Sequence, residues 1–179
     1  HSRGGAVVIE AVKQAPELFA ETEVILEAPI LPEAPVGVQT PSKFINDIAS
    51  KVTMYVFPFV AYVLSKQGLP KFALKNMGPL NPRKSQLLKS LFYSAKSSAV
   101  LMRNLENMID WPIQNKMHLL DNIKGGYILV GSSDSVLSRR LMIKSINKNK
   151  GNLNVVHTKH SSHFISLDIP EQVSRLNFG

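Results

Sequence analysis

The fold of this chain is decided by the stretch Tyr127-Ile128-Leu129-Val130-Gly131-Ser132-Ser133-Asp134. Its apolar residues suit one buried strand, and the closing Gly-x-x-Asp places a carboxylate where that strand ends. A helical pattern follows over residues 136–147, a second apolar strand over 153–157 and another helical segment over 169–177. Strands that alternate with helices are typical of a parallel sheet with crossover helices, so the predicted fold class is α/β.

The start of the chain adds a helix and a strand to this pattern. Residues 6–19 are apolar nearly all round for two turns, as in a helix packed against a sheet, and Pro16 is expected to end or bend it. A short apolar run over 23–26 predicts a strand that leads into a loop at Ala28-Pro29.

The middle of the chain, residues 42–114, is predicted to be helical without a convincing strand. Asn81-Pro82 suits a helix start, with asparagine as the cap and proline in the first turn. The apolar residues that follow recur at three-and-four spacing, which predicts one buried stripe: Leu87, Leu88, Leu91, Phe92, Ala95, Ala99 and Met102. The most apolar run, residues 52–64, has 13 residues against the ~20 that span a bilayer. It fits either a buried helix or a lid that covers an acyl pocket or touches lipid.

The formal net charge of +8 is concentrated in the middle of the chain. Residues 31–120 hold eleven Lys and Arg against four Asp and Glu. These cations form no run of four, which favours a solvated helical face over an anion-attracting surface and argues against nucleic-acid binding. Eight of the eleven lie between residues 66 and 103: Lys66, Lys71, Lys75, Arg83, Lys84, Lys89, Lys96 and Arg103. The absence of cysteine excludes disulfides, a thiolate nucleophile and cysteine-based zinc sites.

The first five residues, His1-Ser2-Arg3-Gly4-Gly5, carry a candidate nucleophile. A serine two residues before a glycine, at the head of an apolar helix, fits a sharp strand-to-helix turn. Such a turn needs small flanking residues and exposes the hydroxyl beside helix-terminal N–H groups. The full pattern is Gly-x-Ser-x-Gly, whose first glycine would lie just before His1. The same residues also suit a simple N-cap serine or a disordered tail.

Further along the chain, Asp134 ends one predicted strand, and His163 follows the next one. The order Ser2, Asp134, His163 matches the order of the α/β-hydrolase catalytic triad. The sequence resembles the C-terminal part of the α/β-hydrolase family, of the capped esterase, lipase and acyl-hydrolase type.

This resemblance implies a partial α/β-hydrolase fold of C-terminal parallel strands with crossover helices, plus an inserted helical cap. Residues 1–30 and 116–179 would form the core, and residues 31–115 the cap or lid, inserted after the sixth strand. The first five strands of the family would precede His1. The chain is therefore expected to be a fragment that begins at the nucleophile elbow and is inactive by itself.

The resemblance also assigns a role to each site residue. Ser2 would be the nucleophile, His163 the base that takes its proton, and Asp134 the carboxylate that orients the imidazole. The backbone N–H of Arg3 would supply one donor of the oxyanion hole. The other donor would come from a loop after the third strand, which this chain lacks.

Two of these residues have alternatives. The series His157-x-x-His160-x-x-His163 could be a zinc cluster, and His160 could replace His163 as the base. Three-residue spacing gathers side chains on a helix, however, whereas this segment has the pattern of a strand and a loop.

Asp134 could serve only as a turn or helix cap, because Ser133-Asp134-Ser135 suits that role. Asp121 and Asp110 are then the reserve candidates for the triad carboxylate.

The expected protein is a serine hydrolase that cleaves an ester or thioester of a small, apolar molecule through an acyl-enzyme. No cofactor, metal or nucleic acid is expected, contact with a membrane surface and the oligomeric state stay open, and a cytoplasmic location is favoured. The alternatives are a non-catalytic binding protein of the same fold, and a C–C hydrolase or acyltransferase that uses the same triad.

Overall fold

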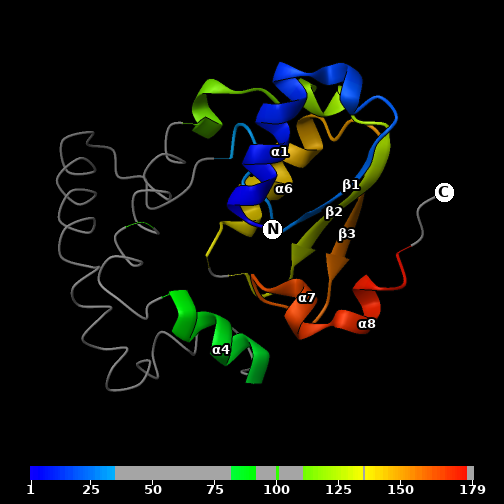
Figure 1. Ribbon diagram of the computed structural model, residues 1–179. Helices are drawn as coiled ribbons and strands as arrows, with labels where there is room; N and C mark the ends of the chain where they lie inside the picture. Colours follow the sequence, from blue (N-terminus) through cyan, green and yellow to red (C-terminus); the bar gives the residue numbers. More distant parts are fainter. Residues whose placement is uncertain (35–81, 92–99, 101–110, 135, 177–179) are drawn as a thin grey trace, which may run out of the picture.

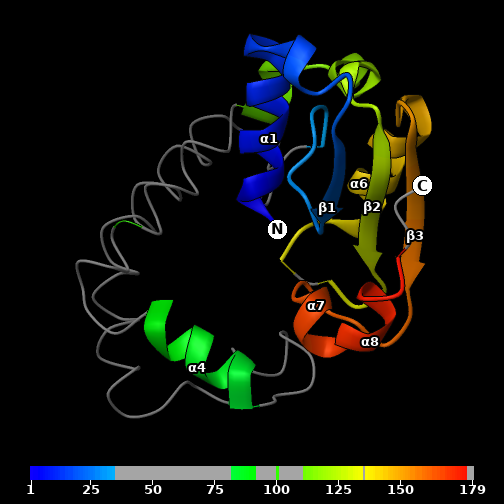
Figure 2. The same cartoon turned by 45° about the vertical axis from the view of Figure 1, so that its right-hand side comes forward.

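The computed structural model describes residues 1–34, 82–91, 100, 111–134 and 136–176 (Figure 1). Within them, three parallel strands form one sheet in the order β1-β2-β3 (Figures 1 and 2). The strands are β1 (Glu23–Glu27), β2 (Gly125–Gly131) and β3 (Leu153–Thr158). This arrangement confirms the predicted α/β class, and the carboxyl ends of the three strands lie at the same edge of the sheet.

The central strand β2 shows why these apolar runs form a buried sheet. Ile128 pairs in register with Leu26 of β1 and Val155 of β3. Because side chains alternate along a strand, Ile128 belongs to the core on one face of the sheet and Leu129 to the core on the other. Both faces are therefore covered, as in most parallel sheets.

Two helices cover the first face. Helix α1 (Arg3–Gln14) precedes β1, and α6 (Arg139–Lys148) connects β2 to β3. Helix α1 ends just before Pro16, where a short 3₁₀ helix η1 (Pro16–Leu18) begins, so the predicted break is confirmed. The core of this face includes Ala6, Ile9, Val12, Leu26, Ile128, Val130, Met142 and Ile146.

Helix α6 begins at Arg139, three residues later than the sequence pattern predicted. The reason is local: the Asp134 carboxylate accepts hydrogen bonds from the N–H groups of Val136 and Leu137, which holds those residues in a turn. The hydroxyl of Ser138 then caps the helix by accepting from Leu141 N–H, 3.4 Å away.

The second face is covered by two short helices, α7 (Ile165–Asp168) and α8 (Pro170–Val173). The helix predicted over 169–177 corresponds to α8, which begins at Pro170 and already ends at Val173, whereas α7 was not predicted. Ile169 between the two helices has φ −138°, outside the helical range, and Pro170 has no N–H to continue a hydrogen-bonded ladder. Ile165 is fully buried against Ala28 and Leu129.

Little of the predicted cap lies within the described residues. Helix α4 (Pro82–Leu91) begins at the predicted proline; residues 100 and 111–114 are also helical, and the 3₁₀ helix η2 (Met117–Asn122) leads into β2. In α4 the expected faces are exchanged at two positions, because Lys84 is fully buried whereas Leu87 is 38% exposed. The segment 52–64 and most of the predicted apolar stripe lie outside the described residues.

The residues at which the chain leaves the sheet region, near Glu33, and returns to it, near Pro112, lie side by side. Glu33 N–H donates to the carbonyl oxygen of Pro112 over 2.6 Å, and the Glu33 carboxylate lies 3.0 Å from Nζ of Lys148. The Trp111 indole N–H donates to the Glu10 carboxylate of α1 over 3.1 Å. The hydrogen bond from Lys148 lowers the pKa of Glu33, and that from Trp111 lowers the pKa of Glu10.

None of the helices in the described ranges has the length and apolar character needed to cross a membrane.

Candidate active site

Ser2 lies in a strained turn immediately before α1. Its φ of 53° and ψ of −121° are rare for a residue with a side chain, and such a conformation costs on the order of 1–3 kcal/mol. The backbone is held there on both sides: Ser2 N–H donates to the Glu27 carbonyl at the end of β1, and the Ser2 carbonyl accepts from Gly5 and Ile30 N–H. The turn therefore fixes the serine at the carboxyl edge of the sheet.

The small residue that this turn requires is Gly5. A Cβ added at Gly5 would lie 2.5 Å from Cβ of Pro29, whereas a Cβ at Gly4 would meet nothing within 4 Å. The glycine two residues after the serine, on which the sequence motif relies, is thus not the one under steric constraint. The close approach of α1 to the segment after β1 puts that constraint one residue later.

His163 and Asp134 form a buried hydrogen-bonded pair. The Nδ1 atom of His163 lies 2.9 Å from Oδ2 of Asp134, and their side chains are 5% and 0% exposed. The other carboxylate oxygen accepts from Val136 N–H at 2.9 Å and Leu137 N–H at 3.0 Å. Asp134 is therefore both a turn cap and the partner of a histidine. Because a carboxylate accepts the hydrogen bond, the proton is assigned to Nδ1, which leaves the lone pair on Nε2.

This contact depends on how closely the loop after β3 packs on the end of β2. Ser133 N–H donates to the Ser161 carbonyl over 2.9 Å. At Gly131 an added Cβ would lie 2.3 Å from the carbonyl oxygen of Ser162. Only glycine allows the two backbones to approach in this way, and the approach brings His163 to Asp134.

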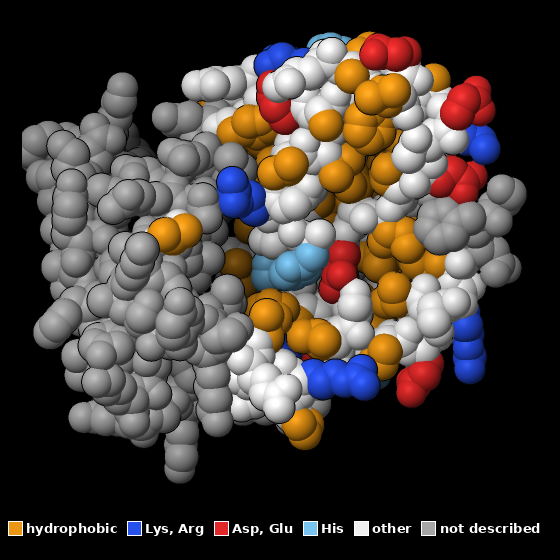
Figure 3. Space-filling view, in the orientation of Figure 1, with side chains coloured by type: hydrophobic (Ala, Val, Ile, Leu, Met, Phe, Trp, Pro, Cys, Tyr) orange, Lys and Arg blue, Asp and Glu red, His pale blue; other side chains and the backbone are white. Residues whose placement is uncertain are grey.

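His1, which adjoins the serine, contacts the histidine loop. Its Nε2 lies 2.8 Å from the His163 carbonyl oxygen, and its ring centroid is 4.7 Å from that of His163 and 5.4 Å from that of Phe164. Figure 3 shows histidine on this face of the molecule beside an acidic side chain. No pattern in the sequence predicts this contact, since only the fold brings residues 1 and 163 together.

The Ser2 hydroxyl makes no capping hydrogen bond to α1, which argues against a simple N-cap serine. Within the described part of the chain, no hydrogen bond links it to His163 either. The structure therefore brings Asp134 and His163 into direct contact, and His1, the neighbour of Ser2, contacts His163.

Comparison with known proteins supports the fold. The chain matches no family model, and a search of curated proteins found no match. Among solved structures it is similar to the crystal structure of a serine-to-alanine variant of N-formylmaleamic acid deformylase from Pseudomonas putida S16, an α/β-hydrolase-fold enzyme. The TM-score is 0.55 and the sequence identity 14%, over 98% of this chain and 63% of that one. This chain has part of an α/β-hydrolase fold. It spans less than two thirds of the deformylase chain.

In this α/β-hydrolase fold, α1 directs its amino end towards the serine turn. The N–H groups of Gly4 and Gly5 donate to the carbonyl oxygens of His1 and Ser2. Arg3 is the first residue of the helix, so its N–H has no carbonyl within the helix to donate to. It lies next to Ser2 at the positive end of the helix dipole.

The alternative site residues are placed elsewhere. His157 and His160 are exposed, and among the residues that the structure describes no group of three His, Asp or Glu side chains is arranged to hold a metal ion. The Asp121 carboxylate is exposed and accepts a hydrogen bond from Asn149. Asp110 lies outside the described residues.

Sequence patterns missed a buried lysine next to this site. Lys84 was assigned to a solvated helical face, and that prediction is wrong: its side chain is 0% exposed and its Nζ lies 2.7 Å from Oδ1 of Asp168. The one available signal was Asp168, a carboxylate between the apolar residues Leu167 and Ile169.

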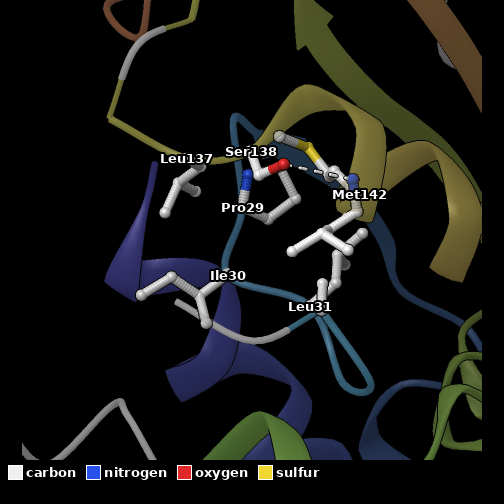
Figure 4. Close-up of a pocket in the computed structure, with 8 residues that line it drawn as sticks. Pro29, Ile30, Leu31, Leu137, Ser138 and Met142 are labelled. Carbon is white, nitrogen blue, oxygen red and sulfur yellow. Dashed lines mark hydrogen bonds between the residues drawn. The ribbon is translucent and has the colours of Figure 1, made fainter. Parts of the chain in front are cut away.

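A small apolar pocket lies beside the Asp134 turn, between the segment after β1 and the start of α6 (Figure 4). It is lined by Pro29, Ile30, Leu31, Ala34, Leu137, Ser138, Leu141 and Met142. A shallower depression follows the outer side of α6. Neither is lined by Ser2 or His163, so neither is assigned to the substrate.

Proposed function

We propose that this protein is a serine hydrolase that cleaves ester or thioester bonds through an acyl-enzyme. Ser2 would be the nucleophile, His163 the general base and Asp134 the carboxylate that orients it. The observation that carries this proposal is the buried contact of 2.9 Å between Asp134 and His163, at the sheet edge where Ser2 is held in a strained turn.

The chemistry follows from the assigned proton positions. As the Ser2 hydroxyl oxygen attacks the carbonyl carbon, its proton passes to Nε2 of His163. Asp134 stabilises the resulting imidazolium through the Nδ1 proton. The tetrahedral intermediate collapses and expels an alkoxide or thiolate, which takes the proton from Nε2. Water then repeats the sequence, and releases the acid and free Ser2.

The negative oxygen of the tetrahedral intermediate needs fixed donors. The Arg3 N–H supports this part of the proposal, because it adjoins the nucleophile and has no intrahelical acceptor. The positive end of the 12-residue helix α1 favours the same charge. Both are in place before the reaction, so neither has to reorganise.

The strain at Ser2 favours catalysis over a binding protein of the same fold. A serine that served only as a cap would hydrogen-bond to the first turn of α1, and Ser2 does not. A conformation that costs on the order of 1–3 kcal/mol persists where it has a use, here the presentation of a hydroxyl. A C–C hydrolase or acyltransferase would use the same residues, so substrates must distinguish them.

The proposed substrate is a small molecule with an apolar acyl group. The support for it is the apolar segment 52–64, which lies outside the described residues. The similar structure is, by its name, that of a deformylase, so an N-formyl amide belongs in the substrate panel beside aryl esters and thioesters.

Replacement of the two reacting residues tests the proposal. Ser2→Ala and His163→Ala are each expected to lower turnover of a short-chain aryl ester by at least ~10³-fold in the complete protein, measured by release of the phenol. The double variant should be hardly worse, since triad residues act as a unit.

His157→Ala is the matched control, because it removes an exposed imidazole from the strand that precedes His163. It should keep most of the activity. Undiminished turnover in Ser2→Ala would rule out the serine mechanism.

A further inference from the structure

A lysine from the middle of the chain is buried against the loop that carries His163. The Nζ atom of Lys84 in α4 lies 2.7 Å from Oδ1 of Asp168 and 3.0 Å from Oγ of Ser162. It also lies 5.5 Å from the centroid of the Phe164 ring. Ser162 and Phe164 are the two neighbours of His163 in the sequence, so the ammonium touches the loop on both sides of the histidine.

The contacts close into a ring. Oδ2 of Asp168 accepts from Ser162 N–H at 2.7 Å and from the Ser162 hydroxyl at 2.6 Å. The side chains of Lys84 and Asp168 are 0% and 2% exposed. Removal of two charges from water costs several kcal/mol per ion, which the pair offsets only with good geometry and further hydrogen bonds. The described hydrogen bonds of this pair go to Ser162, the residue next to His163.

We propose that Lys84 is a positioning residue for His163. This inference rests on the proposed function, in which His163 is the base. Through Asp168 and Ser162, the ammonium fixes the backbone on which the imidazole is carried, and so keeps Nδ1 within hydrogen-bond reach of Asp134. Helix α4 thereby contributes to the geometry of the site as well as to its surroundings.

A second tie holds the other end of the same segment. Ser166 donates from its N–H over 2.7 Å, and from its hydroxyl, to the carboxylate of Glu27 at the end of β1. Because this tie survives without Lys84, loss of the lysine should loosen the loop rather than unfold it. A misplacement of about 1 Å in a reacting group can cost on the order of 10²-fold in rate.

The test is Lys84→Met in the complete protein, with Arg83→Met as the matched control. Arg83 is the adjacent residue of α4 and is exposed, so the control removes a cation from the same helix without touching the loop. Two quantities are measured: kcat and KM for a short-chain aryl ester, and the downfield proton resonance of His163 Nδ1–H, identified by its loss in His163→Ala.

Lys84→Met is expected to lower kcat about 10- to 100-fold per folded molecule and leave KM within about twofold. The downfield resonance should shift or broaden, since the His163–Asp134 hydrogen bond is no longer held in one geometry. A merely less stable protein would keep the resonance of its folded fraction unchanged. Arg83→Met should match the original protein in every quantity.

If Lys84→Met does not fold, because Asp168 is left as a buried unpaired charge, the double variant Lys84→Met/Asp168→Asn removes both charges. It should fold and still show the lower kcat and the altered resonance. Original kcat and resonance in whichever of the two variants folds would overturn the inference. Failure of the proposed function looks different: Ser2→Ala would keep its turnover, while the resonance would still report whether Lys84 holds the loop.

Discussion

At the scale of single residues, Asp134 shows how two interpretations of one side chain can both hold. One oxygen of its carboxylate caps a turn through Val136 and Leu137, and the other meets His163. From the sequence alone, the turn cap and the triad carboxylate were alternative predictions for Asp134. A carboxylate has enough acceptor sites for both, and the cap fixes the orientation in which the second oxygen faces the imidazole.

Replacement of Asp134 by asparagine separates the two roles. The amide oxygen of Asp134→Asn can still accept from the turn, so the melting temperature should change little. Its NH₂ group cannot accept a hydrogen bond from Nδ1–H. The imidazole is then no longer held in the tautomer that leaves Nε2 free, and its charged form loses the carboxylate that stabilises it. We expect kcat for an aryl ester to fall about 10³- to 10⁴-fold. Unchanged kcat would mean that Asp134 acts only as a turn cap.

Lys84 shows the limit of prediction from local pattern. A lysine among polar neighbours is ordinarily solvated, and Leu87 one turn later is ordinarily buried, yet the structure reverses both. The reason is Asp168, which lies 84 residues away in the sequence. An ion pair between residues so far apart in the sequence does not change the hydrophobic periodicity of either helix, so the pattern cannot reveal it.

At the scale of elements, strands were predictable and short helices were not. All three described strands follow apolar runs in the sequence, which therefore marks them within one or two residues. Helix α6 begins late because of the side-chain contacts of Asp134, and the last predicted helix is only the short α8, with the unpredicted α7 before it. The contact between Asp134 and His163 could be predicted from their positions after successive strands. The contacts of His1 and Lys84 could not, because they depend on the packing of distant segments.

The end of β2 offers a test of how one strand positions the site. Gly131→Ala would place a Cβ 2.3 Å from the Ser162 carbonyl, which forces the His163 loop away from Asp134. We expect turnover to fall on the order of 10²-fold and stability by about 1–3 kcal/mol, measured by ester hydrolysis and urea unfolding.

The control for this substitution is Gly125→Ala at the start of the same strand, where a Cβ would lie 3.9 Å from its nearest neighbour. That variant should stay close to the original protein in both measurements. Equal effects of the two alanines would show that loss of a strand glycine, and not the approach of the loop, causes the defect.

At the scale of the whole molecule, Glu33 joins the two ends of the middle segment to α6. Its pKa is lowered, chiefly by the hydrogen bond from Lys148. A carboxyl group with a lower pKa in the folded state stabilises the fold above its unfolded pKa, near the ordinary value of 4.5, and loses that contribution as the pH falls through the folded pKa.

Glu33→Gln should therefore lower the melting temperature at pH 7, by an amount equivalent to about 1 kcal/mol or less. The gap between the variant and the original protein should close as the pH falls below about 4.5. Thermal unfolding followed by circular dichroism between pH 7 and pH 3 measures both quantities. A gap that stays constant over this range would show that the ionised carboxylate is not what stabilises the junction.

The bond between Glu33 and Pro112 has a consequence for how such a protein can change in evolution. Glu33 and Pro112, at the two ends of the middle segment, are joined by one hydrogen bond. For the stability of the sheet, residues 34–111 therefore count as a closed loop. The entropy of closing a loop grows only with the logarithm of its length, about 0.6 kcal/mol for each doubling. Insertions and deletions in the middle segment should therefore change the stability of the sheet little. The His163 loop adds one condition: a residue of the middle segment must still place a positive charge beside Asp168.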